Sequence, residues 1–133
     1  MMNKVAIVAA NYYKEIIDTL VDGVKNNIHE SFDTSIIMVD GAWELIYKIN
    51  NLSINDGIDK FVAIGVIVKG ETDHYEYISR GVVNGLKDLT IKNNIYIANC
   101  VLNVLSIDQA VERSTGQKNK GIEAAFALNN LFV

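Results

Sequence analysis

Short apolar runs alternate with helical patterns along the whole chain, and this alternation restricts the chain to a small set of folds. The four runs lie at residues 4–10, 34–39, 61–68 and 95–102. Each is short, rich in β-branched residues and apolar on both faces, which is typical of parallel strands covered on two sides. The alternation therefore predicts a sheet whose strands are joined by crossover helices.

The segments between these runs repeat apolar residues at the spacing of one helix face. The predicted helices extend over residues 16–28, from about 42 to 51, 78–89, 107–113 and 121–131. Together the strands and helices predict a single domain over residues 1–133, with α/β architecture. Its expected form is three α/β/α layers around a four-stranded parallel sheet.

The composition fits one domain that associates with copies of itself. A chain of 133 residues is long enough to bury its own core. Half of the residues are hydrophobic and only 21% are charged, which favours a large core or a surface buried against another subunit. We expect a homo-oligomer. The formal net charge of −4, with no segment that concentrates Lys and Arg, argues against nucleic acid as a partner.

Cysteine usage and hydropathy predict a cytoplasmic protein. Cys100 is the single cysteine and lies in a predicted strand, so we expect a buried, unreactive thiol in a reducing compartment. No apolar run approaches the ~20 residues that span a bilayer, so no membrane partner is expected. The first ten residues look like a short signal peptide, but they continue directly into an amphipathic helix. They are interpreted as a first core strand.

The predicted sheet also places the ligand site. Open α/β sheets bind ligands beyond the carboxyl ends of their strands. In this chain those points are residues 11–13, 40–44, 69–74 and 103–104, and polar and aromatic residues gather at all of them.

The turn at residues 68–77 carries the clearest chemical indication. It follows a strand, contains Gly70 and opens a helix, so its backbone N–H groups could hold an anion such as phosphate. His74 beside it could carry a proton near neutral pH. Together they predict chemistry on a phosphorylated small molecule. The alternative is structural: Asp73 and Glu76 would form a capping box, and Gly70 would only turn the chain.

Other candidates also have two interpretations each. Tyr12 and Trp43 could stack on a planar heterocycle, although Trp43 could equally be a core residue at a helix start. Glu44 could accept hydrogen bonds from substrate hydroxyl or ring N–H groups, or simply favour the helix dipole. Arg113 is either a solvated helical residue or an anion ligand that acts across a subunit boundary. His29, the second histidine, is expected to be structural or exposed.

Several common site motifs are missing from the sequence. There is no Gly-x-Gly-x-x-Gly after the first strand, no P-loop, no Gly-x-Ser-x-Gly and no zinc-type spacing of Cys and His. The expected chemistry is therefore acid–base work with no metal and no cofactor.

Five ordered segments match one known family. They are residues 7–12, 39–45, 65–77, 106–113 and 119–125, and they include the run Gly-x-Thr-x-His-Tyr-x-Tyr followed by Gln-Ala-Val-Glu-Arg and Asn-Lys-Gly. On these segments the chain resembles the lumazine synthase family of riboflavin biosynthesis over almost its whole length. The resemblance implies a flavodoxin-like fold and an enzyme.

The resemblance also implies roles for individual residues. Tyr12 would stack on the pyrimidine substrate, the segment Ala42-Trp43-Glu44 would hold its ring and ribityl chain, and His74 would be catalytic. The remaining implied substrate contacts are the strand end Val66, Ile67 and Val68, the phosphate turn Glu71 and Thr72, the phosphate-binding Arg113, and Asn99 near the substrate.

The implied reaction is the condensation of 5-amino-6-ribitylaminouracil with 3,4-dihydroxy-2-butanone 4-phosphate to 6,7-dimethyl-8-ribityllumazine. The implied assembly is a homopentamer, alone or within a larger shell, with riboflavin synthase as a further partner. The chain departs from the family pattern at Asn11, Tyr13, Asp40 and Asn99 and in the loop at residues 114–118. The alternative functions are a catalytically weak homologue that binds riboflavin or lumazine, and a shell protein without activity.

Overall fold

The computed structural model describes residues 3–133, in which strands and helices alternate as the sequence predicts. The elements are β1 (Asn3–Ala10), α1 (Lys14–Lys25), β2 (Phe32–Val39), α2 (Glu44–Asp56), β3 (Lys60–Val68), α3 (His74–Asn93), β4 (Tyr96–Val104), α4 (Ile107–Glu112), the 3-10 turn η1 (Gly116–Lys118) and α5 (Lys120–Phe132). The second helix is longer than predicted and continues to Asp56. Residues 1–2 of the predicted domain lie outside the described part.

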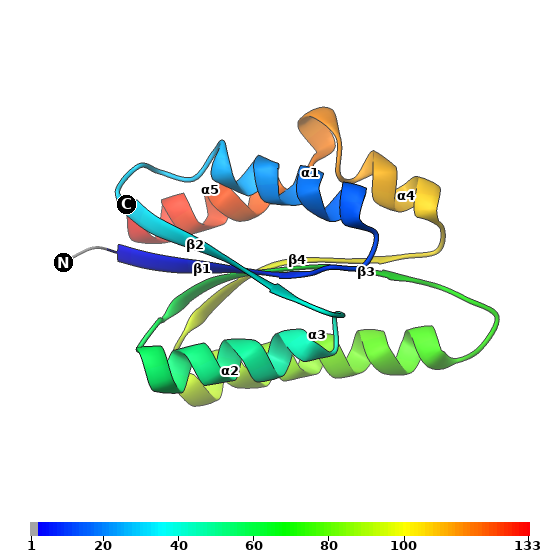
Figure 1. The fold of residues 1–133 in the computed structure, drawn as a ribbon, viewed down its shortest axis with the longest axis horizontal. Coiled ribbons are helices and arrows are strands. Elements are labelled where there is room, and N and C mark those ends of the chain that lie inside the picture. Colours follow the sequence, from blue (N-terminus) through cyan, green and yellow to red (C-terminus); the bar gives the residue numbers. More distant parts are fainter. Residues whose placement is uncertain (1–2) are drawn as a thin grey trace.

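The strands form one parallel sheet in the order β2-β1-β3-β4. Helices α1, α4 and α5 lie on one face of the sheet, and α2 and α3 lie on the other (Figure 1). The predicted three-layer, flavodoxin-like α/β/α fold with four parallel strands is therefore confirmed.

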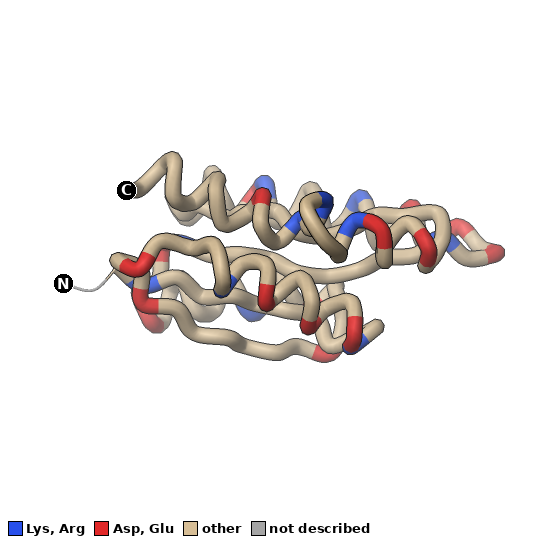
Figure 2. Tube along the Cα trace, turned by 90° about the horizontal axis from the view of Figure 1, so that it is seen from above, with Lys and Arg blue, Asp and Glu red and all other residues tan. Residues whose placement is uncertain are grey.

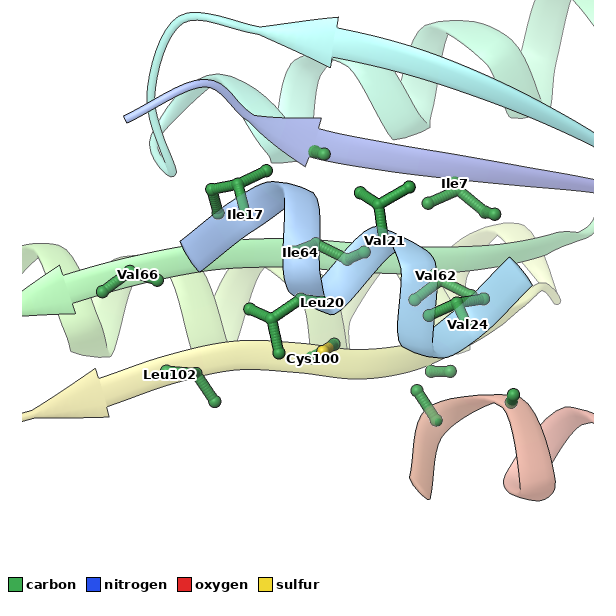
Figure 3. Close-up of a cluster of buried hydrophobic side chains, with 14 of the residues drawn as sticks. Ile7, Ile17, Leu20, Val21, Val24, Val62, Ile64, Val66, Cys100 and Leu102 are labelled. Atoms are coloured by element: carbon green, nitrogen blue, oxygen red, sulfur yellow. The ribbon is translucent and has the colours of Figure 1, made fainter. Parts of the chain in front are cut away.

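The apolar strand runs follow from two separate cores, one on each face of the sheet. Along β1, Ile7 packs toward α1 and α5, whereas its neighbour Val8 packs toward α2 and α3. Side chains alternate between the faces of a strand, so both sets must be apolar when both faces are covered. Figure 3 shows how Leu20 and Val21 of α1 point onto the strands.

One strand does not follow this prediction. β2 was expected to be covered on both faces, but Ile36 and Met38 are 42% and 44% exposed. β2 is an edge strand, and α1 packs on β1 and β3 instead. The expectation was wrong because an apolar run is the same in sequence whether a helix or another molecule covers it.

Helix α5 is fastened to the end of α1 by side-chain amides. The Asn129 Oδ1 atom accepts a hydrogen bond from the backbone N–H of His29 at 2.9 Å, and its Nδ2 atom donates to the Asn27 carbonyl at 2.9 Å. His29 is exposed and its ring bonds the nearby Ser31, so the expectation of a structural or exposed histidine is confirmed. These bonds join segments about one hundred residues apart in sequence.

The surface carries both signs of charge. Along the trace, Lys and Arg are interspersed with Asp and Glu rather than gathered by sign (Figure 2). Among residues 3–133, no helix combines the length and apolar character needed to cross a membrane.

Cys100 lies in the core between the sheet, α1 and α5, as Figure 3 shows, and it is 1% exposed. Burial raises the pKa of its thiol to about 12. The thiolate is the reactive form, so the expectation of a buried, inert cysteine is confirmed.

The raised pKa of Cys100 makes the stability of the fold depend on alkaline pH. As the pH rises above the ordinary thiol pKa of 9.0, the unfolded chain loses this proton and the folded chain keeps it. The contribution of this thiol to the free energy of unfolding is therefore complete below pH 9 and is lost progressively as the pH rises from 9 toward about 12. We expect the free energy of unfolding of the wild type to fall by about 1.4 kcal/mol more than that of Cys100→Ala between pH 7 and pH 10. Parallel pH profiles of the two proteins would contradict this.

Candidate active site

The loops that follow the strands meet at one edge of the sheet, on the right of Figure 1. Backbone bonds hold them there. The Asn11 N–H donates to the Val39 carbonyl at 2.7 Å, and the Lys69 N–H donates to the Val104 carbonyl at 2.9 Å. The predicted positions after β1 and β2 are therefore neighbours, and so are those after β3 and β4.

Two tyrosines follow β1. Tyr13 adopts a left-handed backbone conformation with φ of 62°, and its carbonyl accepts the N–H groups of Ile16 and Ile17 at 3.0 and 3.1 Å. A tyrosine in this conformation is strained, and such strain often marks functional positions. The rings of Tyr12 and Tyr13 meet edge to face at 4.7 Å. This leaves Tyr12 62% exposed, with a ring available for stacking.

The segment Ala42-Trp43-Glu44 opens α2. Trp43 is 55% exposed, so the alternative of a core tryptophan is wrong. Glu44 is exposed and folds back over the helix start, where its Oε1 atom would lie 3.0 Å from a Cβ atom on Gly41. Ala42 packs on the core beneath. Like Tyr12 after β1, this segment follows the carboxyl end of its strand, β2.

The end of β3 offers backbone rather than side chains. Val66 and Ile67 are buried and Val68 is partly buried. The pairing of β3 with β1 ends at Ile64, whereas its pairing with β4 continues to Val68. The β1 side of residues 65–68 therefore carries N–H and C=O groups that β1 does not bind. A polar heterocycle could use them in place of a strand.

The turn before α3 differs from the predicted capping box. Asp73 makes no side-chain bond to the helix start, and the Thr72 hydroxyl instead accepts the N–H of His74 at 3.3 Å. Glu71, Thr72 and His74 are all exposed. The capping-box alternative is wrong, because the Asp73 side chain does not bond to the helix start. The Thr72 hydroxyl accepts one of the backbone N–H groups there. The carboxylates of Asp73 and Glu76 are left toward solvent.

Asn99 lies away from this cluster in the same chain. It pairs in register with Ala63 near the middle of β4, five residues and therefore ~16 Å from the strand end at Val104. Its Oδ1 atom accepts the Val101 N–H at 3.0 Å. This covers a backbone donor on the outer edge of the sheet.

Arg113 is also apart from His74. It caps α4, which belongs to the layer of α1 and α5, while His74 begins α3 on the opposite face of the sheet (Figure 1). Its Nη1 atom donates to the Gln109 carbonyl of its own helix at 3.4 Å. Arg113 lines a groove of 510 Å³ together with Lys118, Lys120, Glu112 and Glu123. Lys118 pairs with Glu112 at 3.1 Å and Lys120 with Glu123 at 3.0 Å, so within residues 3–133 Arg113 is the cation of this groove without a carboxylate partner. The groove is not joined to His74 within one chain.

Asn119 organises that groove, a role that sequence reasoning missed. It is 7% exposed, its Nδ2 atom donates to the Thr19 carbonyl at 3.0 Å, and its Oδ1 atom accepts the Gly121 N–H at 2.7 Å. It therefore caps α5 and fixes the helix to α1. The Lys120 N–H donates to the Arg113 carbonyl at 2.9 Å, which closes the loop between them. An Asn before a helix was visible in the sequence, but its partner Thr19 was not.

The model of the family described as 6,7-dimethyl-8-ribityllumazine synthase matches residues 2–132. The chain belongs to this family. Proteins of the same description include one from Zymomonas mobilis that is 37% identical over 133 residues, covering 98% of this chain and 95% of the relative. Another, from Aquifex aeolicus, is 34% identical over 135 residues, covering 95% and 87%. The resemblance to the lumazine synthase family is thus confirmed.

The candidate residues of this lumazine synthase family member lie on two separate layers of the chain. Tyr12, Trp43, Glu44 and His74 all follow the carboxyl ends of β1, β2 and β3, whereas Asn99 lies within β4 and Arg113 follows α4. Among residues 3–133, no three Cys, His, Asp or Glu side chains group as a metal-ligand set.

The loop that carries Arg113 should depend on Asn119. We expect Asn119→Ala to lower the free energy of unfolding by about 3 kcal/mol, because a helix cap and a buried amide bond are lost and the Thr19 carbonyl loses its partner. Chemical denaturation measures this change. The control is Asn130→Ala in the same helix, which removes an exposed side chain and should cost less than about 0.5 kcal/mol. Equal costs for the two variants would contradict the assigned role.

Proposed function

We propose that this lumazine synthase family member joins 5-amino-6-ribitylaminouracil to 3,4-dihydroxy-2-butanone 4-phosphate at the carboxyl edge of its sheet. The product is 6,7-dimethyl-8-ribityllumazine, with phosphate and water released. Family membership supports the reaction. The observation that supports the site is that Tyr12, Trp43, Glu44 and His74 all follow strand ends at the edge where β3 extends beyond its pairing with β1.

The pyrimidine would lie between the aromatic residues and the end of β3. Stacking on Tyr12 or Trp43 contributes ~0.5–1.5 kcal/mol beyond the burial of area. The backbone groups at Val66, Ile67 and Val68 that β1 leaves unbound would read the polar edge of the ring. Glu44 would accept hydrogen bonds from the ribityl hydroxyls, with Ala42 as the floor beside it.

The chemical steps need proton transfers and the departure of an anion. The 5-amine attacks the ketone carbon, and loss of water leaves a Schiff base. Removal of the proton at C3 then expels phosphate from C4, and the resulting enol takes up a proton at C4 to become a ketone at C3. Attack of the ribitylamino nitrogen on this new carbonyl closes the ring with loss of a second water. His74 would accept and return the protons. Holding both substrates together at one edge of the sheet supplies the rest of the rate enhancement.

The phosphate would bind at the turn of Glu71 and Thr72, at the start of α3, where backbone N–H groups and the helix dipole favour an anion. Arg113 would supply the cation. Because Arg113 and Asn99 lie apart from His74 within one chain, we assign both to a neighbouring copy. The exposed Ile36 and Met38 on edge strand β2 are consistent with such contacts between copies. We propose a homopentamer, free or within a shell.

The cytoplasm is the compartment we propose, since all of the chemistry concerns small soluble metabolites. Riboflavin synthase, an enzyme class that would consume the lumazine product, is a proposed further partner.

A synthase assay tests the proposed function. The purified protein is mixed with both substrates, and the lumazine product is followed by its fluorescence. Product formation well above the uncatalysed background, and dependent on both substrates, is expected. A folded oligomer that gives no enhancement would overturn the proposal.

The two histidines of the chain provide a matched test of the proton carrier. We expect His74→Ala to lower kcat by ~10²-fold, the lower end of the usual contribution of a positioned acid–base group. His29→Ala removes the other histidine, which bonds Ser31, and should leave the rate within a factor of two. Native oligomer size should be unchanged in both. Equal rates for His74→Ala and the wild type would exclude His74 from the mechanism.

The two arginines allow a second matched test. Arg113→Ala should raise the KM for the butanone phosphate by ~10-fold or more, because a charge-assisted bond to phosphate is lost. The KM for the pyrimidine should change little. Arg80→Ala, which removes an exposed arginine of α3, should leave both constants near the wild-type values. A larger effect on the pyrimidine than on the phosphate would show that Arg113 is assigned to the wrong substrate.

A further inference from the structure

The ring of Trp43 lies directly against the backbone of helix α3. A Cβ atom added to Gly81 would lie 2.7 Å from Cζ3 of Trp43 and 3.4 Å from its Cη2 atom. The shorter distance leaves no room for a methyl group unless the ring moves, whereas the longer one is an ordinary van der Waals contact. The indole therefore occupies the space that a side chain at position 81 would fill.

This contact is part of a regular register between α2 and α3. One turn further along each helix, Ile46 lies over Gly85, where an added Cβ atom would be 2.9 Å from Cγ1 of Ile46. Further on, the Asn93 Nδ2 atom donates to Asn50 Oδ1 at 2.9 Å. The helices thus run side by side in the same direction, as Figure 1 also shows. Trp43 makes the contact nearest the carboxyl edge.

Gly81 also has a fixed relation to His74. Seven residues separate them, which is almost two helical turns, so they project from the same face of α3 at a spacing of ~10 Å along its axis. The ring that rests on Gly81 is therefore aligned with the proposed proton carrier. If the ring moves away from α3, its distance from His74 changes.

Backbone conformation does not require a glycine here. The positive-φ glycines of the described chain are Gly57 and Gly116, so Gly81 has a conformation open to any residue. Glycine is unfavourable within a helix relative to alanine. Helix stability alone would favour alanine at position 81. The structure gives the reason for glycine instead, because the Trp43 ring lies too close to leave room for a methyl group.

We infer that Gly81 is a positioning residue for the synthase reaction, which seats Trp43 against α3 and so sets where the pyrimidine stacks relative to His74. The inference rests on the proposed function, because it takes Trp43 as the surface that holds the pyrimidine. Gly81 itself does not touch the substrate. It acts through the placement of the indole.

The test is Gly81→Ala. Because Trp43 is 55% exposed, its ring can move outward, and the helix should keep or raise its thermal midpoint. The KM for the ribitylaminopyrimidine should rise by roughly three- to tenfold, the loss expected when a stacking contact is misplaced, with a smaller change in kcat. The emission of Trp43, the single tryptophan, should shift. The double variant Gly81→Ala, Trp43→Phe carries a smaller ring at position 43. Its KM for the pyrimidine should therefore lie close to that of Trp43→Phe alone.

Gly85→Ala is the matched control, because it makes the same change one turn along the same helix but meets Ile46. It should leave the emission of Trp43 and the KM for the pyrimidine within a factor of two of the wild type. If Gly81→Ala leaves that KM unchanged, or if Gly85→Ala raises it equally, the positioning role is refuted.

Failure of the proposed function gives a different result. A wild-type protein without synthase activity would refute that function directly. The positioning role is then decided by titrating the pyrimidine against Trp43 fluorescence. Weaker binding by Gly81→Ala than by Gly85→Ala would retain it, and equal binding would overturn it.

Discussion

The parallel arrangement of the four strands is the constraint on which the rest of the structure depends. Strands that run in one direction need helical crossovers, and the crossovers cover both faces of the sheet. The two apolar cores around Ile7 and Val8 follow from this. The same geometry brings every strand end to one edge, so the polar residues excluded from the cores gather there. Burial and site formation are two results of one topology.

The sheet also divides the proposed reaction between its two faces. His74, Trp43 and Glu44 belong to the layer of α2 and α3 or its edge, and Arg113 belongs to the layer of α4 and α5. A site that needs both would be completed by a neighbouring copy, as we propose. In that arrangement Arg113, which would bind the phosphate, and His74, which would carry the proton, come from different subunits. Activity would then require assembly.

The sequence predicted the element order, the parallel sheet and the carboxyl edge as the ligand site, because each depends on local periodicity. Contacts between residues that are far apart in the chain could not be predicted from the sequence. Trp43 is exposed, and its ring rests against α3 at Gly81, a contact that no pattern near Trp43 indicates. The Thr72 hydroxyl, and not Asp73 as in the structural alternative, bonds to the start of α3, since several polar residues of one turn can cap the same helix. Whether the site residues act as the resemblance implies stays a prediction.

The bonds between α1 and α5 bear on how the chain reaches this fold during synthesis. Asn129 and Asn119 bind backbone atoms of residues 27, 29 and 19, which leave the ribosome about one hundred residues earlier. Until α5 emerges, the apolar face of α1 around Leu20 and Val24 lacks part of its cover. Contacts of such long sequence separation form late and slow folding. Nascent chains should therefore expose this layer longest, which makes it the surface for chaperones to protect.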